Sequence, residues 1–152
     1  MDIAEEWIKR ANCESDVYNK FISAYIALNF LYGGFNFEIL SEQKKKLEER
    51  DKMSLYLMNL CQELSIDPFE PSDCVSEYLK HPVKDERPEH DAECSTQRGD
   101  CIALFKAIYQ VRCNLFHGNK FLSNERDRKL VGEGAAVILK VLNAFYQKLK
   151  NS

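Results

Sequence analysis

Apolar residues recur with helical spacing through the first third of the chain. In the stretch 3–11 they lie four, one and three positions apart, which predicts an amphipathic helix. Ser15 or Asp16 can cap a second helix that ends at the glycine pair 33–34. Apolar residues surround this second helix on nearly all sides, so we expect it to lie centrally in a bundle, with Asn29 as a hydrogen-bonded polar group of the core.

A third helix is predicted from Ser41 to about Ser65, charged in its first turns and apolar afterwards. The next segment, 66–99, contains all four prolines of the chain, many charges and little periodicity. We interpret it as a long, partly ordered connection in which only the stretch CVSEYLK makes one or two helical turns. A connection of this length in a compact domain is typically functional or mobile.

Helical spacing returns in the last third of the chain. Apolar residues four, three and four positions apart predict a fourth helix from Asp100 to about Gly118. Ser123 or Asn124 can cap a fifth helix, which spans about 125–149. Two glycines inside this last helix lower its intrinsic stability and permit close contact with a neighbouring helix.

These elements predict an all-α fold, since no stretch alternates apolar and polar residues as a β-strand does. We expect one domain over 1–152, built as a bundle of four to five helices with the long connection 66–99 before the fourth helix. The composition, 45% hydrophobic and 30% charged, is that of an ordinary globular protein.

Charge and cysteine content limit the class of protein and the cellular compartment that fit this chain. The net charge of −3 argues against a protein that coats nucleic acid through a large basic surface, although positive residues concentrate in 112–129.

The chain begins without the apolar run of a secretory signal, and its longest apolar stretch, 21–35, is too short to cross a bilayer. The six cysteines form no CxxC pair, and four potential ligands have spacings that match no common zinc site: Cys74, His81, His90 and Cys94. We therefore expect a cytoplasmic protein without membrane contact, metal or cofactor.

The end of the fourth helix carries Arg112-Cys-Asn-Leu-Phe-His117, which contains the groups needed to cleave RNA without a metal. Such cleavage requires a proton acceptor or donor, and His117 suits this task because an imidazole can act as a base or as an acid. It also requires a cation that stabilises the charge developing at phosphorus. Arg112 provides this cation, because its guanidinium presents a planar set of hydrogen-bond donors. The amide of Asn114 can orient the phosphate or the histidine. These three are the candidate catalytic residues.

The position of these residues around the helix bears on how a site is assembled. An ideal helix turns about 100° per residue, so Arg112 and His117 flank opposite sides of the core-facing stripe that contains Val111. One regular helix does not bring them together, whereas a distortion near Gly118 or a second copy across a two-fold axis does. We favour the second copy, so that each motif contributes half of two shared sites. A mixture of Arg112→Ala and His117→Ala chains then regains activity, whereas self-sufficient chains regain none.

The motif and its surroundings resemble HEPN ribonucleases, which carry an R-x4-6-H motif on a helix near the end of a small α-bundle. Further similarity lies in FISAYIALNFLYGGF, like the second helix of plasmid-borne and defence-associated members, in LFHGNKF, and in ERDRKLV, like the start of their last helix. The resemblance covers most of the chain except 66–99. It implies an endoribonuclease that needs no metal, leaves a 2′,3′-cyclic phosphate and acts as a homodimer. It also implies a toxin, an antiviral defence effector or an RNA-processing enzyme, with an antitoxin or regulatory protein as a further partner.

Four further residues are candidates for RNA binding: Lys120, Arg126, Arg128 and Tyr109. The basic ones can equally belong to the solvated start of the fifth helix, and the tyrosine can be a core or interface residue. Some HEPN members are inactive, so the alternative to a nuclease is a non-catalytic module that binds RNA or protein and dimerises. Incubation of labelled RNA with the purified protein in EDTA distinguishes the two.

Overall fold

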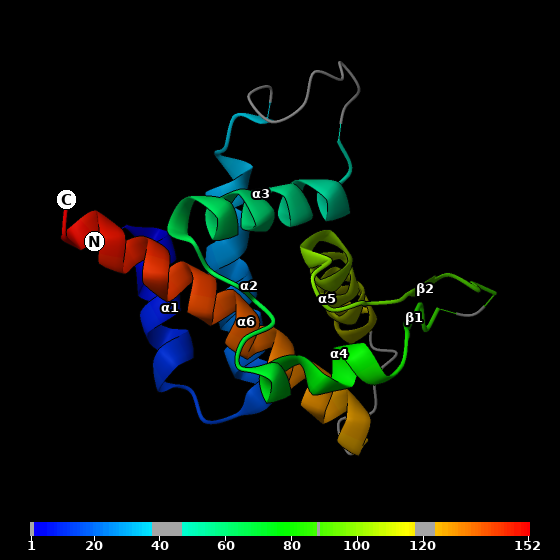
Figure 1. Ribbon diagram of the computed structural model, residues 1–152. Helices are drawn as coiled ribbons and strands as arrows, with labels where there is room; N and C mark the ends of the chain where they lie inside the picture. The colour runs from blue at the N-terminus through cyan, green and yellow to red at the C-terminus, as the bar shows by residue number, and fades with distance from the viewer. Residues whose placement is uncertain (1, 38–46, 88, 118–123) are drawn as a thin grey trace.

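The computed structural model of the chain describes residues 2–37, 47–87, 89–117 and 124–152 (Figure 1). Within these ranges the chain forms six α-helices, a 3-10 turn and one pair of two-residue strands. The expectation of an all-α fold is confirmed. No helix in the described ranges is long and apolar enough to cross a membrane.

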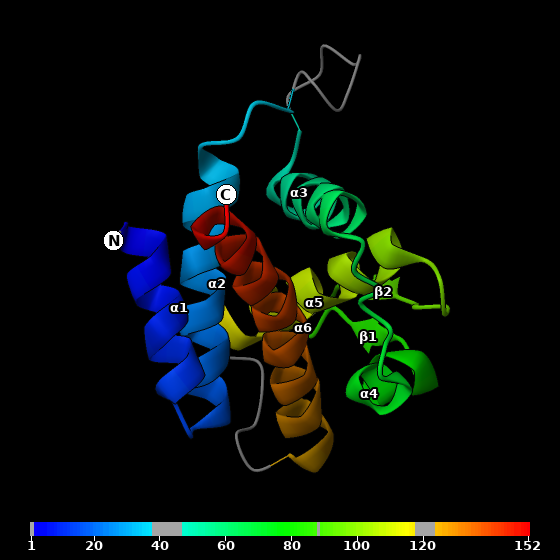
Figure 2. The same ribbon diagram turned by 60° about the vertical axis from the view of Figure 1, so that its left-hand side comes forward.

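Helices α1 (Ile3–Cys13) and α2 (Val17–Gly33) lie side by side (Figures 1 and 2). Asp16 caps α2, because its side chain accepts the backbone N–H of Asn19 at 2.9 Å. The central position predicted for α2 is confirmed, since it packs against α1, α3 and α6. It contributes seven buried residues: Tyr18, Phe21, Ala24, Tyr25, Ala27, Leu28 and Tyr32.

The expectation for Asn29 is wrong, because this residue is exposed rather than part of the core. The buried side of α2 is centred near Leu28, and an ideal helix turns the next residue about 100° away from it. Phe30, one position further, is 51% exposed. The asparagine therefore lies at the edge of the buried side, next to solvent.

Helix α3 (Glu49–Leu64) ends where the sequence predicts, with Ser65 in the left-handed conformation at φ 54°. Its start differs from the prediction. The expected first residues, 41–46, lie outside the described part of the chain, and Leu47 and Glu48 are not helical. The helix packs against α5 along one side of the molecule (Figure 1).

Helices α5 (Cys101–Phe116) and α6 (Glu125–Lys150) correspond to the fourth and fifth helices of the prediction. Asp100 and Asn124 are their N-caps, and each side chain accepts the backbone N–H three residues later, at 3.0 and 3.1 Å. In Figure 2, α6 runs beside α2, while α3 and α5 pack against each other. The apolar sides of both groups form one core.

The connection 66–99 is more ordered than its composition suggests. It contains the 3-10 turn η2 (Ser72–Val75), helix α4 (Ser76–Lys80) and the antiparallel strands β1 (Val83–Lys84) and β2 (Glu93–Cys94). The helical turns expected for CVSEYLK are confirmed, whereas the expectation of no strand is wrong. A pair of two-residue strands is too short to show the alternating pattern by which strands are detected.

Buried side chains fasten this connection to the bundle: Phe69, Val75, Tyr78 and Val83. The hydroxyl of Tyr78 donates to the Leu130 carbonyl oxygen at 2.6 Å. Gly134 leaves room for that ring, because a Cβ there would lie 2.7 Å from the Tyr78 hydroxyl and 3.0 Å from Phe21. The close contact expected at the glycines of the last helix is therefore present at Gly134.

Candidate functional site

The side of α5 that faces away from the core carries the motif. Val111 is fully buried, and Cys113 lies about 160° from it around the helix. Measured from Cys113, Arg112 is turned by about 100° in one direction and His117 by about 40° in the other. The two candidate residues are therefore separated across the outer side of the helix as well as across its core-facing stripe.

Arg112 and His117 line one cavity of about 450 Å³ within a single chain. The outer side of α5, the start of α3 and the β1–β2 hairpin surround this cavity, which we call the motif cavity. Residues outside α5 that line it are Glu48, Glu49, Arg50, Asp85, Arg87, His90 and Ala92. The arginine and the histidine of one chain thus border the same cavity, and the sharing of sites between two copies stays a prediction.

Aromatic rings surround the guanidinium of Arg112. Its central carbon lies 4.7 Å from the ring centre of Phe116 and 5.1 Å from that of Tyr25. The ring centre of Tyr109 is 5.6 Å away. The faces of these rings attract the guanidinium cation, but they do not accept hydrogen bonds from all of its N–H groups. The Nε of Arg112 is buried without a hydrogen-bond partner among the described residues, and Nη1 faces Cys113 Sγ at 3.9 Å. Because solvent does not reach Nε, an anion would have to bind the terminal nitrogens of the guanidinium.

Asn114 does not line the motif cavity. Its side chain is buried beneath the hairpin, where Nδ2 donates to the Lys84 carbonyl oxygen at 2.8 Å. Its Oδ1 accepts the backbone N–H of Glu86 and the Nε2–H of Gln110, both at 3.0 Å. The amide expected to orient a phosphate or a histidine is thus occupied by the hairpin backbone, and Asn114 positions the hairpin against α5.

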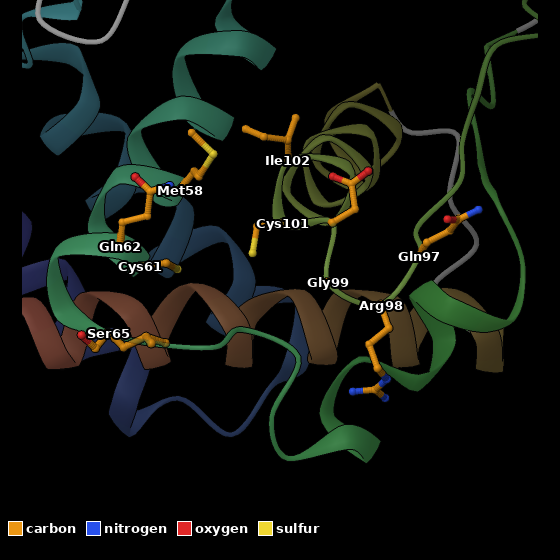
Figure 3. A pocket seen from close by; sticks show the side chains of 11 residues that line it. Met58, Cys61, Gln62, Ser65, Gln97, Arg98, Gly99, Cys101 and Ile102 are labelled. Atoms are coloured by element: carbon orange, nitrogen blue, oxygen red, sulfur yellow. The ribbon is translucent and has the colours of Figure 1, made fainter.

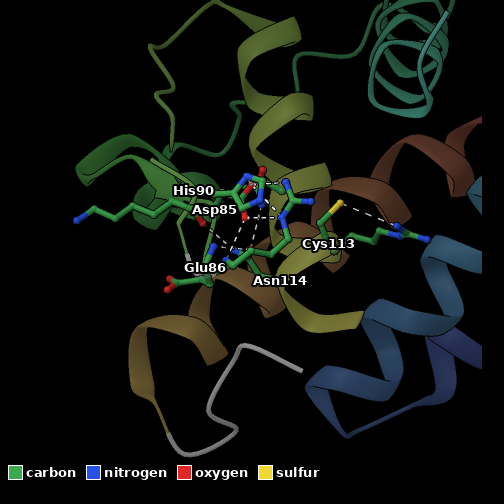
Figure 4. A network of polar contacts seen from close by, with 9 residues as sticks. Asp85, Glu86, His90, Cys113 and Asn114 are labelled. Carbon is green, nitrogen blue, oxygen red and sulfur yellow. Dashed lines mark hydrogen bonds and ion pairs between the residues drawn. The ribbon is translucent and has the colours of Figure 1, made fainter. Parts of the chain in front are cut away.

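The hairpin carries a cluster of one carboxylate and two basic groups (Figure 4). Arg87 donates to Asp85 through Nη2 at 2.6 Å and through Nε at 3.0 and 3.2 Å. The Nδ1 atom of His90 lies 3.7 Å from Asp85 Oδ2. The hydrogen bonds from Arg87 lower the pKa of Asp85 to about 2, although burial acts in the opposite direction. Asp85 is therefore ionised at neutral pH.

The start of α3 adds a third arginine to the motif cavity. The buried Nε of Arg50, like that of Arg112, has no hydrogen-bond partner among the residues that the structure describes. Glu49 is engaged on the other side, because it accepts the hydroxyl of Tyr32 at 2.6 Å. Three arginines and three carboxylates line the cavity, so their formal charges cancel. An anion would therefore meet no strong positive field here and would depend on local contacts with single guanidinium groups.

The predicted RNA-binding residues are only partly near this cavity. Tyr109 lines it, whereas Lys120 lies outside the described residues. Arg126 binds the connection, since its Nη2 donates to the carbonyl oxygens of His81 at 3.1 Å and of Pro82 at 3.3 Å. Arg128 is exposed on the first turn of α6, away from the cavity lining.

Most of the lining residues were not among the sequence candidates, and the four that matter most for chemistry are Arg50, Asp85, Arg87 and His90. The sequence signal for three of them is the charged run DERPEH inside the connection. Of these four residues, the sequence singles out only His90, as a possible zinc ligand with unsuitable spacing. The described residues hold no group of three or more side chains placed to bind a metal ion.

A larger cavity of about 740 Å³ lies at the other end of α5, beside the C-terminal half of α3 (Figure 3). Cys61 and Cys101 line it. Burial raises the pKa of Cys61 to about 12 and also raises the pKa of Cys101. Both therefore remain thiols near neutral pH and are poor nucleophiles. The motif cavity holds the more reactive set of side chains.

Comparison with known proteins adds no relative. No family model matches the chain. Neither the search of curated proteins nor the search of solved structures finds a match. The resemblance to HEPN ribonucleases therefore stays a prediction that rests on the motif and the three similar segments.

Proposed function

We propose that this protein is a metal-independent endoribonuclease of the HEPN type, which cleaves RNA by attack of a 2′-hydroxyl on the adjacent phosphorus. The observation that carries the proposal is that Arg112 and His117 line one cavity. The resemblance of the motif to HEPN ribonucleases supports the same chemistry and a 2′,3′-cyclic phosphate product.

Each residue of the cavity has a role in this proposal. Arg112 binds the scissile phosphate through the terminal nitrogens of its guanidinium and stabilises the charge that builds up on the phosphate oxygens. His117, exposed at the end of α5, transfers a proton. Tyr109 offers a ring face to a base or sugar. Asn114 contributes indirectly, because it holds the hairpin at the edge of the cavity.

We further propose that the active form is a cytoplasmic homodimer. The contact that we propose between copies covers Phe116, which is 45% exposed beside Arg112. Dimerisation would align two cavities along one RNA rather than create each site. A role as a toxin or antiviral defence effector, held in check by an antitoxin or regulatory protein, follows from the resemblance alone.

Cleavage of labelled RNA in EDTA tests the proposal. Wild type is expected to cut single-stranded RNA, whereas His117→Ala and Arg112→Ala are expected to be slower by about 100-fold or more. Arg10→Ala is the matched control for Arg112→Ala, because Arg10 is an exposed arginine of α1 outside the cavity lining. Intact RNA with wild type at micromolar concentration, across several substrates, would reject the nuclease.

The alternative is a non-catalytic module that binds RNA. The enclosure of Arg112 by three aromatic rings favours it, because stacking and a fixed cation suffice to hold a nucleotide. The same incubation, followed by a filter-binding measurement, separates the two. RNA that is retained by wild type, released by Arg112→Ala and never cut would identify a binding module.

A further inference from the structure

The β1–β2 hairpin brings a second histidine to the motif cavity. Asn114 binds the backbone on both sides of Asp85, through the Lys84 carbonyl oxygen and the Glu86 N–H. The hairpin is therefore fixed to the same helix that carries Arg112 and His117. His90, from the hairpin, lines the cavity with those two residues.

Asp85 is placed to orient this histidine. Its side chain is 3% exposed, and Arg87 keeps it ionised through the bonds described above. The Nδ1 atom of His90 is 3.7 Å from Asp85 Oδ2, while 47% of the His90 side chain remains exposed. This separation is longer than a hydrogen bond, and contacts of catalytic groups often shorten only when substrate binds. A carboxylate facing Nδ1 selects the tautomer with a proton on Nδ1 and a lone pair on Nε2.

We propose that His90 is a second catalytic residue, the general base that removes the proton from the attacking 2′-hydroxyl, and that Asp85 is its positioning residue. This inference rests on the proposed ribonuclease function. His117 then acts as the general acid. Its place at the C-cap of α5 suits that role, because the carboxyl end of a helix stabilises a positive charge.

The proton transfers balance in one step. Nε2 of neutral His90 accepts the 2′-hydroxyl proton, and O2′ forms a bond to phosphorus. The bond from phosphorus to O5′ breaks as protonated His117 gives its proton to O5′. The products are a 2′,3′-cyclic phosphate and a 5′-hydroxyl, with His90 protonated and His117 neutral. Exchange with water restores both residues, and the ionised Asp85 stabilises the imidazolium that forms on His90.

An RNA with sulfur in place of the scissile O5′ tests these assignments, because a thiolate leaves without a proton. On ordinary RNA we expect His90→Ala and His117→Ala each to slow cleavage by about 100-fold or more. On the sulfur substrate, His117→Ala should approach the wild-type rate, whereas His90→Ala should remain slow. His81→Ala is the control, since this exposed histidine is outside the cavity lining.

The test of Asp85 must measure a property of His90 that would stay unchanged if Asp85 had only a structural role. We expect 15N chemical shifts of the His90 ring to show a proton on Nδ1 in wild type and a mixture of tautomers in Asp85→Asn. Far-UV circular dichroism of each variant confirms that the helices are retained.

The outcomes separate this inference from the proposed function. If wild type cleaves RNA and His90→Ala cleaves equally well, the base assignment is wrong while the nuclease stands. Recovery of His90→Ala, rather than of His117→Ala, on the sulfur substrate would reverse the two roles and overturn the proposal. If wild type leaves ordinary RNA intact, the ribonuclease itself is rejected, and the general base with it.

Discussion

The side-chain amide of Asn114 bonds to the backbone on both sides of Asp85. Nδ2 donates to the Lys84 carbonyl oxygen at 2.8 Å, and Oδ1 accepts the Glu86 N–H at 3.0 Å. The motif helix thereby determines where the hairpin lies. A residue that looks catalytic in the sequence has a structural task, and through it the acidic and basic groups of the hairpin reach the motif cavity.

Replacement of Asn114 by Leu should destabilise the protein, because it removes the three hydrogen bonds that this buried side chain makes to Lys84, Glu86 and Gln110. The expected loss is about 1–3 kcal/mol in the free energy of unfolding, measured by urea denaturation. Asn143→Leu is the control, since Asn143 is exposed and bonds only to the exposed Asn12 side chain among the contacts described. A loss of less than about 0.5 kcal/mol for Asn114→Leu, as for an ordinary surface change, would contradict the placement of the amide.

The Asp85–Arg87 pair should make the free energy of unfolding depend on pH in the acidic range. Because the pKa of Asp85 in the folded protein is lowered to about 2, its stabilising contribution is complete above the unfolded value near 4. The contribution is lost as the pH falls through about 2. Wild type should therefore exceed Asp85→Asn in unfolding free energy at pH 7, by a difference that shrinks as the pH falls below about 4.

The measurement is urea denaturation of both proteins at pH 7, 4 and about 2.5. Asp91→Asn serves as the control, because Asp91 is an exposed carboxylate of the same hairpin. A difference between wild type and Asp85→Asn that stays constant over this range would show that the carboxylate is not held ionised by Arg87.

Two glycines of α6 should respond in opposite ways to alanine. A Cβ at Gly134 would lie 2.7 Å from the Tyr78 hydroxyl and 3.0 Å from Phe21, so Gly134→Ala should cost about 1–3 kcal/mol. At Gly132 the nearest atom, of Val17, is 3.4 Å away. Gly132→Ala should therefore stabilise the helix by about 0.5–1 kcal/mol. Thermal unfolding of both variants measures these changes. Equal changes in stability for the two variants would rule out the close packing of α4 on α6.

Mixed chains test whether each cavity is complete. Since Arg112 and His117 line one cavity of the same chain, a mixture of Arg112→Ala and His117→Ala proteins should cleave no faster than either alone. The mixture must be unfolded and refolded together so that heterodimers form. Recovery of activity toward a quarter to a half of the wild-type rate, on the order expected for one restored site in mixed dimers, would show that the site is shared.

Local signals explain why the helices were predictable. The caps Asp16, Asp100 and Asn124 act within three residues of their own position, and the apolar stripes repeat at the period of a helix. The hairpin has no such signal, because a side chain from α5 holds it in place. Asn29 is exposed although apolar residues flank it, because the sequence around it does not reveal which side of α2 lacks a neighbour.

The site was predictable only in part. The sequence identified Arg112, His117 and Tyr109, and all three line the motif cavity. The expectation that two copies share each site stays a prediction, which the mixture of Arg112→Ala and His117→Ala chains tests. Arg50 and His90 reach the cavity through the packing of α3 and of the hairpin, which no local spacing encodes.

The most direct test of the central claim is the chemical identity of the RNA ends formed in EDTA. Wild type should release fragments with 2′,3′-cyclic phosphate and 5′-hydroxyl ends, identified by mass spectrometry, and His117→Ala should release them at least about 100-fold more slowly. RNA that stays intact, or fragments with 3′-hydroxyl and 5′-phosphate ends, would contradict the assignment of Arg112 and His117 as a metal-independent ribonuclease site.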